Sequence, residues 1–378
     1  MSRKLPFALL HQSLQKDVTT VLSTTPGVAV AYRIRDVAER AGVSKTTVSR
    51  VLNQSPLVDP KTRRKVLETA RKLNYYRNAN AQWLAQGRSG FFGLIISDIE
   101  NPVFPEMIKS FENAAAQKGY DLLLCTTNYD RERTQVVVRK MIENRVRGVA
   151  VMTSGASEAV AGALAERQVP VVFLDLGLTR KYVSDIRIDY SIGIIEAVDH
   201  LLELGHKRFG FVAGSNARRS ARKYRQAVVE AFSLRGVSSP KIVECDQTFE
   251  GGAAAVQVLL AQRQIPTAIL CINDLTAVGV MSGLRDAGVR VPEEVSVVGC
   301  EDIYFSRFVN PPLTSVRLDR KLLGNKAFEV LESMFQSRQR TGTESVLETR
   351  LIVRKSTSHC PTAAFTRQFH QQPQSATW

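Results

Sequence analysis

The sequence predicts a two-part protein: a small all-α head-piece with a helix-turn-helix, followed by a larger α/β body of two lobes. Three observations predict this fold class. Positive charge is concentrated in the first quarter of the chain, short amphipathic helices joined by a tight turn occupy the same region, and apolar strands alternate with amphipathic helices after it. The length of 378 residues suits two or three domains.

The charge distribution indicates a polyanionic partner for the head-piece. The chain carries 51 lysines and arginines against 36 acids, a net charge of +15. Residues 1–90 hold 16 of these basic residues and only five acids, a net charge of +11, which leaves +4 for the rest. A basic region with apolar periodicity is typical of a nucleic-acid-binding domain rather than of a solubilising tail, and the body is a nearly neutral globular domain.

Composition and cysteine usage exclude several classes of protein. The 44% of hydrophobic and 23% of charged residues are ordinary globular values. Because no apolar stretch approaches the roughly 18 residues of a transmembrane helix, we expect no membrane partner. The five cysteines lie far apart with no C-x-x-C pair, so we expect neither a disulfide framework nor a metal site. The apolar run over residues 5–10 is too short for a secretion signal, and we expect a cytoplasmic protein.

The basic region predicts two short helices joined by a three-residue turn. Apolar residues recur at helical spacing over 34–41 and stop at Gly42, a glycine suited to the left-handed position after a helix. Ser44 can cap a second helix over 45–52. The residues expected to face the core are Ile34, Val37, Ala38, Ala41, Val48, Val51 and Leu52. Such a helix-turn-helix places the N-terminal residues of its second helix in the major groove of DNA.

Polar residues of this second helix are the candidate DNA contacts. Lys45 and Thr46 lie at its leading end, where base edges are reached, and Arg50 one turn later can pair bidentately with a guanine. The short hydroxyl side chains that suit phosphate oxygens are those of Ser44, Thr47 and Ser49.

A third helix is predicted to begin with Asp59 as its N-cap and Pro60 at its first position. Its inward residues are expected to be Val66, Leu67, Ala70 and Leu73. Its outer face is expected to carry Lys61, Arg63, Arg64, Lys65, Arg71 and Lys72. Such a row of positive charge either contacts DNA phosphates or faces solvent.

From residue 91 onward the pattern is that of parallel sheets covered by helices, in two lobes. The predicted strands are 91–97, 122–126, 148–153, 169–175, 209–213, 241–245, 268–273 and 296–301. The predicted helices lie near 105–118, 134–144, 191–204, 221–234, 252–261 and 275–287. No nucleotide-binding glycine loop, nucleophile elbow or H-E-x-x-H motif is present, so we predict no catalytic residue, no cofactor and no metal ligand.

The head-piece resembles that of the LacI/GalR family of bacterial transcription regulators. The ungapped run from Asp36 to Asn53 carries this resemblance, and residues 73–75 and 78–85 are similar to the family's hinge. The resemblance implies that Asn53 also contacts DNA, and that residues 78–86 form a hinge helix that folds when two copies pair in the minor groove. In such a hinge Asn78 and Ala81 lie against the DNA, and Leu84 is the apolar wedge between two base pairs.

The body, from residue 91 to about 356, resembles the regulatory core of the same family, which shares its fold with periplasmic binding proteins. The similar stretches are 101–104, 200–206, 266–268, 271–274, 291–299 and 311–314. The resemblance implies a periplasmic-binding-protein-like body that dimerises and binds a small effector in the cleft between its lobes, beyond the C-terminal ends of the strands.

The resemblance also implies a set of effector-binding residues. Asp175, Asn273 and Glu301 follow predicted strands and match positions that hydrogen-bond the effector, and Phe104 matches an aromatic residue that stacks on it. Glu301 replaces the family's usual aspartate, and its longer side chain should shrink or shift the pocket. The family's effector-clamping arginine falls on Tyr224 in this sequence. The flanking Arg222 or Arg225 is therefore the predicted clamp.

The predicted organisation is a flexible extension over 1–32, a helix-turn-helix domain over 33–77, a hinge helix and linker over 78–90, an effector-binding and dimerisation domain over 91–356, and a flexible tail over 357–378. The predicted function is a sequence-specific transcription regulator, in its simplest form a repressor. It would bind a palindromic operator as a homodimer and respond to a small effector such as a sugar or related metabolite. The alternatives are a solute-binding protein of the same body fold and an enzyme on an α/β scaffold.

Overall fold

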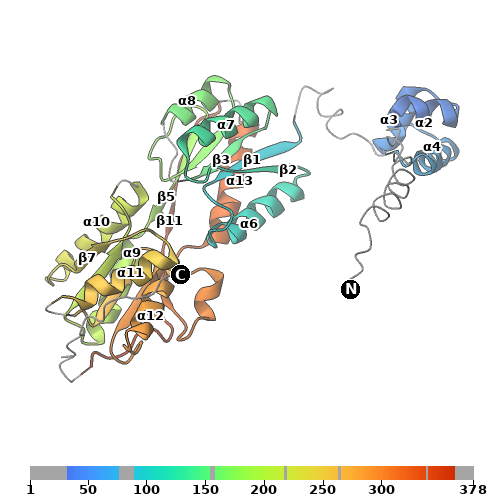
Figure 1. Cartoon of the computed structure of the whole chain (residues 1–378). Helices are drawn as coiled ribbons and strands as arrows, with labels where there is room; N and C mark the ends of the chain where they lie inside the picture. Colours follow the sequence, from blue (N-terminus) through green and yellow to red (C-terminus); the bar gives the residue numbers. More distant parts are fainter. Residues whose placement is uncertain are drawn as a thin grey trace, which may run out of the picture. The chain divides into compact units, whose positions relative to one another are not determined.

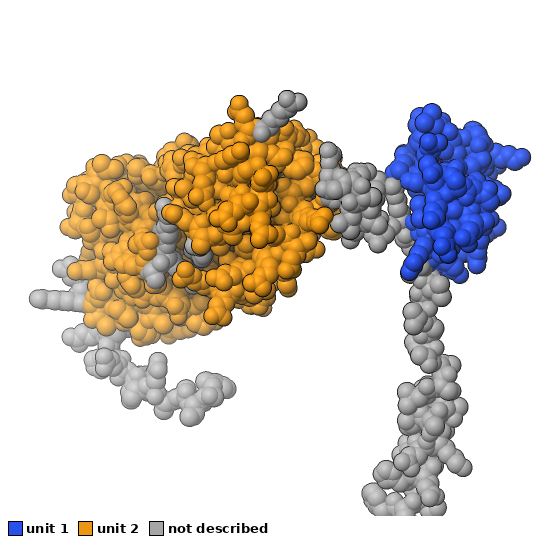
Figure 2. Space-filling model, turned by 90° about the horizontal axis from the view of Figure 1, so that it is seen from above, with its two compact units in different colours: residues 1–82 blue, residues 83–378 orange. Residues whose placement is uncertain are grey.

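The computed structural model describes residues 32–75, 89–153, 158–216, 219–262, 265–337 and 339–361. The chain divides into two compact units, residues 1–82 and 83–378 (Figure 2), and the division falls within the predicted hinge and linker. The predicted hinge residues Asn78, Ala81 and Leu84 lie outside the described residues. No helix in the described ranges is long and apolar enough to cross a membrane.

The first unit contains the three predicted helices, α2 (Ile34–Ala41), α3 (Lys45–Leu52) and α4 (Pro60–Lys72). Gly42 ends α2 with a left-handed φ of 60°. The Ser44 hydroxyl accepts a hydrogen bond from the Thr47 N–H at 3.0 Å, and the Asp59 carboxylate accepts one from the Thr62 N–H at 2.9 Å. The predicted caps are therefore confirmed, because each depends on residues that are neighbours in sequence.

The core of this unit follows the predicted helix faces with one exception. Its buried residues are Val37, Ala38, Ala41, Val48, Val51, Val66, Ala70 and Leu73. Leu67 is 38% exposed, so the prediction that it faces inward is wrong. Adjacent helical residues point about 100° apart, and the inward position on this turn of α4 is taken by Val66.

Lobe 1 of the body is a six-stranded parallel sheet with helices on both faces (Figure 1). In spatial order its strands are β11 (Glu344–Glu348), β5 (Val183–Asp189), β4 (Val171–Leu174), β3 (Val149–Met152), β1 (Phe91–Ile96) and β2 (Asp121–Thr126). Helices α6 (Phe104–Gln117) and α13 (Arg320–Gln336) pack on one face, and α7 (Arg131–Glu143) and α8 (Glu158–Glu166) on the other.

Lobe 2 repeats this plan with one antiparallel strand, β12, at its edge. In spatial order its strands are β12 (Arg350–Ile352), β10 (Thr314–Arg317), β9 (Ser296–Glu301), β8 (Ala268–Cys271), β6 (Phe209–Ala213) and β7 (Lys241–Glu244). Helices α9 (Ser191–Glu203) and α10 (Arg219–Leu234) pack on one face, and α11 (Phe249–Leu260) and α12 (Asp274–Asp286) on the other.

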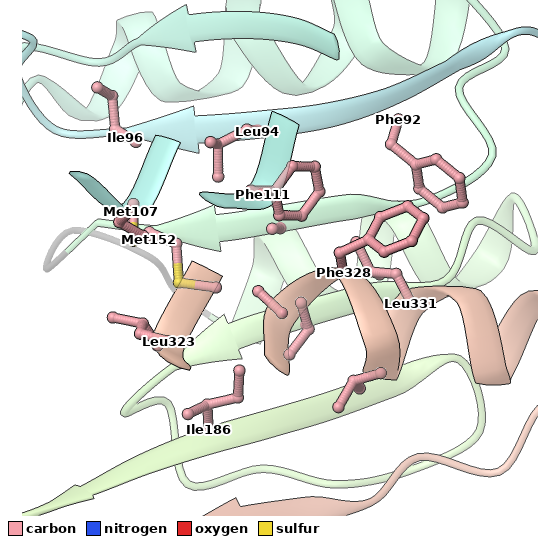
Figure 3. Close-up of a cluster of buried hydrophobic side chains, with 14 of the residues drawn as sticks. Phe92, Leu94, Ile96, Met107, Phe111, Met152, Ile186, Leu323, Phe328 and Leu331 are labelled. Carbon is pink, nitrogen blue, oxygen red and sulfur yellow. The ribbon is translucent and has the colours of Figure 1, made fainter. Parts of the chain in front are cut away.

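The chain passes between the lobes three times, after β5, after β10 and between β11 and β12. The second crossing sends α13 back to lobe 1, where it closes the core shown in Figure 3. There Phe328 contacts Phe92 of β1 and Phe111 of α6 edge-on, with ring centroids 5.2 and 5.7 Å apart. Because each lobe is built from segments on both sides of a crossing, the lobes share a junction that places residues of both around one cavity.

The predicted strands and helices of the body are all present, within a few residues of the expected bounds. The prediction omitted β5, β10, β11, β12, α8 and α13. The flexible tail was predicted to begin at residue 357, which is too early. Residues 357–361 are tied to lobe 2, where His200 Nε2 lies 2.9 Å from the Thr357 hydroxyl and the Cys360 N–H donates to the carbonyl of Leu204 at 2.8 Å. These bonds hold the chain beyond β12 against α9.

Candidate nucleic-acid interface and effector site

Helix α3 presents a polar face to solvent and an apolar face to the core of the first unit. Val48 and Val51 are buried, whereas Thr46, Arg50 and Asn53 are exposed and follow one another at helical spacing. Lys45 is also exposed at the start of the helix. The structure therefore brings the predicted base-reading residues together on one open surface, and their contacts with bases stay a prediction.

Two of the three predicted phosphate contacts, Ser44 and Thr47, lie at the N-terminal end of the same helix, with their hydroxyls 2.9 Å apart. A helix N-terminus leaves backbone N–H groups unpaired and carries partial positive charge. These two hydroxyls thus lie beside a position that favours a phosphate oxygen. Ser49 lies in the second half of the helix, where its hydroxyl is 3.4 Å from Nδ2 of the C-cap residue Asn53.

Arg63 has a different position from the one predicted. Instead of facing solvent with the other basic residues of α4, it is half-buried and its guanidinium donates to the backbone carbonyls of Val51 and Ser55. These carbonyls belong to the last turn of α3 and the segment after it. Arg63 therefore bonds the Ser55 carbonyl and adds a second donor to the Val51 carbonyl, which also accepts the Gln54 N–H, and it fixes α3 against α4.

The two lobes of the body enclose a cavity of about 180 Å³ at their junction. Lobe 1 contributes residues that follow β1, β3 and β4 and the start of α6, and lobe 2 contributes the end of β9 and the start of α10. The cavity is lined by polar and aromatic side chains, among them those of Asn101, Phe104, Asp175, Tyr190, Gln247, Glu301 and Arg320. Three predicted effector-binding residues, Phe104, Asp175 and Glu301, thus line one cavity.

Asp175 connects this cavity to both lobes. It lies at the end of β4 with a left-handed φ of 58° and is 8% exposed. Its carboxylate accepts hydrogen bonds from the Ile188 N–H at 3.2 Å and from Lys223 Nζ at 2.7 Å. Since Ile188 belongs to lobe 1 and Lys223 to α10 of lobe 2, the ion pair joins the lobes beside the cavity.

The arginines predicted to clamp the effector do not line the cavity. Arg222 donates to the carbonyl of Asn216 at 2.6 Å, and Arg225 pairs with Glu244 of β7 at 2.5 Å. Tyr224, which lies between them, is buried and contacts the cavity residue Tyr190 edge-on. Lys223 of α10 bonds the cavity residue Asp175, and nothing in the sequence pattern marked it as part of the site.

Asn273 lies behind the cavity wall rather than in it. It is buried at the N-cap of α12, where its side-chain oxygen accepts a hydrogen bond from the Thr276 N–H at 2.8 Å. Its Nδ2 donates to the carbonyl of Gln247 at 3.3 Å, and Gln247 lines the cavity. A direct contact with an effector stays a prediction, and the geometry gives Asn273 a role in holding Gln247.

Glu301 and Arg320 define the charge of the cavity. Burial, and to a smaller extent the charge of Asp274, raise the pKa of Glu301 to about 8 against the opposing effect of Arg320. The Glu301 carboxyl is therefore protonated at neutral pH and can donate a hydrogen bond. Arg320 pairs with Glu106 of α6 at 2.8 Å and donates to the carbonyls of Glu301 and Asp302. It thus joins lobe 1 to lobe 2.

Two family models match this chain. Residues 33–78 match "Bacterial regulatory proteins, lacI family", and residues 198–357 match "Periplasmic binding protein-like domain". The first range contains α2, α3 and α4, and the second contains most of lobe 2 together with α13 and β11 of lobe 1. A solute-binding protein accounts for the second match alone, so the matches support the regulator and not that alternative.

Relatives and a solved structure match this chain over most of its length and over nearly all of their own. The HTH-type transcriptional repressor PurR of Pasteurella multocida is 32% identical over 85% of this chain and 98% of its own length. Catabolite control protein A of Priestia megaterium is 33% identical over 86% of this chain and 98% of its own length. A crystal structure of the lac repressor dimer bound to operator and the anti-inducer ONPF matches with a TM-score of 0.77 and 29% identity, over 86% of this chain and 99% of that one. This chain therefore belongs to the LacI family of bacterial transcriptional regulators.

Proposed function

We propose that this regulator is a cytoplasmic repressor that binds a palindromic operator as a homodimer, and that an uncharged small molecule in the cavity of the body changes its operator affinity. The observation that carries the proposal is that one chain holds both the exposed polar face of α3 and a cavity lined by two lobes. A solute-binding protein needs only the second of these. The transcriptional repressor PurR, which aligns over nearly its whole length, supports the first.

The lining of the cavity favours a neutral, hydroxylated effector. Lys223 is neutralised by Asp175, and the guanidinium of Arg320 donates to Glu106 and to two backbone carbonyls. No unpaired cation is thus offered to an anionic effector by these two residues. Phe104 and Tyr190 present aromatic rings, and Glu301 offers a proton, which suits a sugar or a related metabolite.

An exposed aromatic cluster on lobe 2 supports the homodimer. The 3-10 helix η1 (Tyr304–Arg307) and the residue after it hold Tyr304, Phe305 and Phe308, which are 59%, 59% and 64% exposed. The Tyr304 ring lies 5.7 Å from that of Phe305 and 5.3 Å from that of Phe308. Contiguous exposed aromatics of this kind mark protein interfaces, and a second copy of the chain is the partner that a palindromic operator requires.

The proposal is tested by selecting operators from random duplex DNA with the full chain and then screening effectors. We expect a palindromic consensus, and we expect a neutral sugar or nucleoside to raise the melting temperature and change operator affinity. Asp175→Ala should abolish the response while unliganded operator affinity stays within a few-fold. Phe308→Glu should shift sedimentation toward the monomer. Selection of no consensus, or an unchanged response in Asp175→Ala, would contradict the respective part of the proposal.

A further inference from the structure

A second cavity, on lobe 1, is lined by arginines and by no acidic residue. Its volume is about 410 Å³, and it lies among the segments that follow α7, α8 and α13. Its basic residues are Arg145, Arg147, Arg167 and Arg340, which together we call the arginine groove. Ser89 and Phe335 also line this groove. The effector cavity shares no residue with this groove.

Three of the four arginines of the groove form no ion pair with a carboxylate in the part of the chain that the structure describes. Of these three, Arg145 and Arg167 are exposed and Arg340 is half-buried. The internal segments outside the described residues contain neither aspartate nor glutamate. Positive charges gathered in one groove repel one another, so the arrangement favours an anion.

Two of the arginines are held in place by aromatic rings. The Arg147 guanidinium lies 4.7 Å from the ring centroid of Tyr120 and 4.8 Å from that of Phe335, and its Nε donates to the carbonyl of Ser89 at 2.6 Å. The Arg340 guanidinium lies 5.2 Å from the same Phe335 ring. Stacking uses the flat face of the Arg340 guanidinium, so its N–H edge can face an oxygen acceptor, whereas Arg147 is buried and adds its charge to the wall of the groove. The groove is therefore partly organised before any ligand arrives.

Two of the arginines lie at backbone positions that favour glycine. Arg145 and Arg340 have φ values of 50° and 53°, in the left-handed region that glycine adopts without steric cost. Neither backbone position requires a side chain, and arginine is less favourable than glycine in this conformation. The backbone at these positions therefore does not itself call for the arginine side chains that line the groove, and glycine can replace both without backbone strain.

We propose that the arginine groove binds a phosphate-bearing anion. Guanidinium groups pair bidentately with phosphate oxygens, and four of them around one cavity suit a doubly charged group better than a single carboxylate. The same chemistry could be supplied by a free phosphorylated small molecule or by the phosphodiester backbone of bound DNA. The site is separate from the effector cavity and does not depend on the function assigned to it.

The test uses the full chain, inorganic pyrophosphate and the double variant Arg145→Gly/Arg340→Gly. Glycine removes both guanidiniums and suits both backbone conformations, so the melting temperature without ligand should be unchanged or higher. Calorimetric titration should show that the variant binds pyrophosphate at least about tenfold more weakly than the wild type. The control is Arg131→Gln, which removes an exposed arginine at the first position of α7, about 18 Å along the helix axis from the end that adjoins the groove. This variant should bind pyrophosphate as the wild type does.

A second experiment distinguishes the two sources of phosphate. The salt dependence of affinity for a random 40-bp duplex is measured for wild type and double variant. If DNA occupies the groove, the slope of log Kd against log salt should fall by about two per protomer, since each lost phosphate contact contributes about 0.9. An unchanged slope together with lost pyrophosphate binding assigns the groove to a free phosphorylated molecule. If neither measurement changes in the double variant and in Arg167→Gln, which leaves the left-handed positions intact, the proposal is wrong.

Discussion

Lys223 Nζ lies 2.7 Å from the carboxylate of Asp175, and this ion pair connects α10 of lobe 2 to the end of β4 in lobe 1. The Asp175 carboxylate also accepts the N–H of Ile188, so it keeps its place in lobe 1 without Lys223. A ligand that hydrogen-bonds Asp175 from inside the cavity competes with Lys223 for the same oxygens. We therefore expect occupancy of the cavity to change how strongly the lobes are held together, which is a differential contact of the kind that effector control requires.

The first prediction concerns the strength of this ion pair. Lys223→Met should lower the free energy of unfolding of the body by about 1–2 kcal/mol, because it leaves a largely buried carboxylate with one hydrogen bond fewer. The estimate is below that for a fully buried pair, since the Lys223 side chain is 30% exposed. Urea unfolding of the full chain, followed by the transition of the body, measures the change.

Arg225→Met is the matched control, because it removes another cation of α10 from an ion pair, with Glu244, whose carboxylate is half exposed. The loss there should stay below about 1 kcal/mol. A double-mutant cycle with Asp175→Asn isolates the coupling between Lys223 and Asp175. Equal losses in Lys223→Met and Arg225→Met would show that the pair between the lobes has no special weight.

Local signals account for what the sequence predicted well. The bounds of α2, α3 and α4 follow from Gly42, Ser44 and Asp59, whose capping partners lie within four residues. Strand β5 was missed because two polar residues near its start, Ser184 and Asp185, are buried, so its sequence contains no continuous apolar run. The edge strands β11 and β12 are short and carry charged residues that leave no apolar pattern to read.

The cavity shows where sequence reasoning stops. Strand ends could be located, and so Asp175 and Glu301 were predicted to lie near a ligand, and both line the cavity. The partners that set their chemistry could not be predicted, because Lys223 is 48 residues from Asp175 and Arg320 is 19 residues from Glu301 and lies on an element that the prediction omitted. Which residue of α10 reaches across the junction depends on the rotation of that helix, and a one-residue change points a side chain about 100° away.

The second prediction concerns base reading by α3. Arg50→Ala should cost roughly 1–3 kcal/mol of binding free energy on the selected operator and much less on random duplex, since a bidentate guanine contact is lost only on the specific site. Affinities for both DNAs at one salt concentration give the comparison. Arg64→Ala, on the exposed face of α4, should weaken both DNAs alike and flatten the salt dependence. Equal losses for Arg50→Ala on both DNAs would make Arg50 a phosphate contact.

The third prediction separates a structural arginine from its exposed neighbour. Arg63→Ala should destabilise α3 by about 1–2 kcal/mol, because the Ser55 carbonyl loses its side-chain donor and the Val51 carbonyl keeps only the Gln54 N–H. Hydrogen exchange of the α3 amides in the full chain reports this local opening. In Arg64→Ala the same amides should exchange at the wild-type rate. Faster exchange in both variants, or in neither, would remove the distinction drawn from the geometry.

The sign of the pH dependence follows from the protonation of Glu301. Burial raises the pKa of its carboxyl to about 8, far above its usual 4.5. The folded body therefore holds a proton that the unfolded chain releases between about pH 4.5 and pH 8. Since stability falls with pH wherever the folded state binds more protons, the free energy of unfolding should decrease through this window and level off above it. Asp274, whose pKa burial raises to about 6, contributes to the lower part of the same window.

The last prediction uses Glu301→Gln to test this protonation. Glutamine resembles the protonated carboxyl in shape and cannot ionise, so the variant should match the wild type near pH 4, where Glu301 is protonated in the folded and the unfolded chain. At pH 8.5 it should exceed the wild type's free energy of unfolding by about 3–5 kcal/mol. Urea unfolding at pH 4, 7 and 8.5 gives both curves, and Glu132→Gln, which removes an exposed carboxylate of α7, should leave the pH dependence unchanged. The response to an effector should also survive in Glu301→Gln at pH 7, because the protonated carboxyl and the amide both donate a hydrogen bond into the cavity. A variant that loses stability as steeply as the wild type between pH 6 and 8 would show that Glu301 is already ionised at neutral pH.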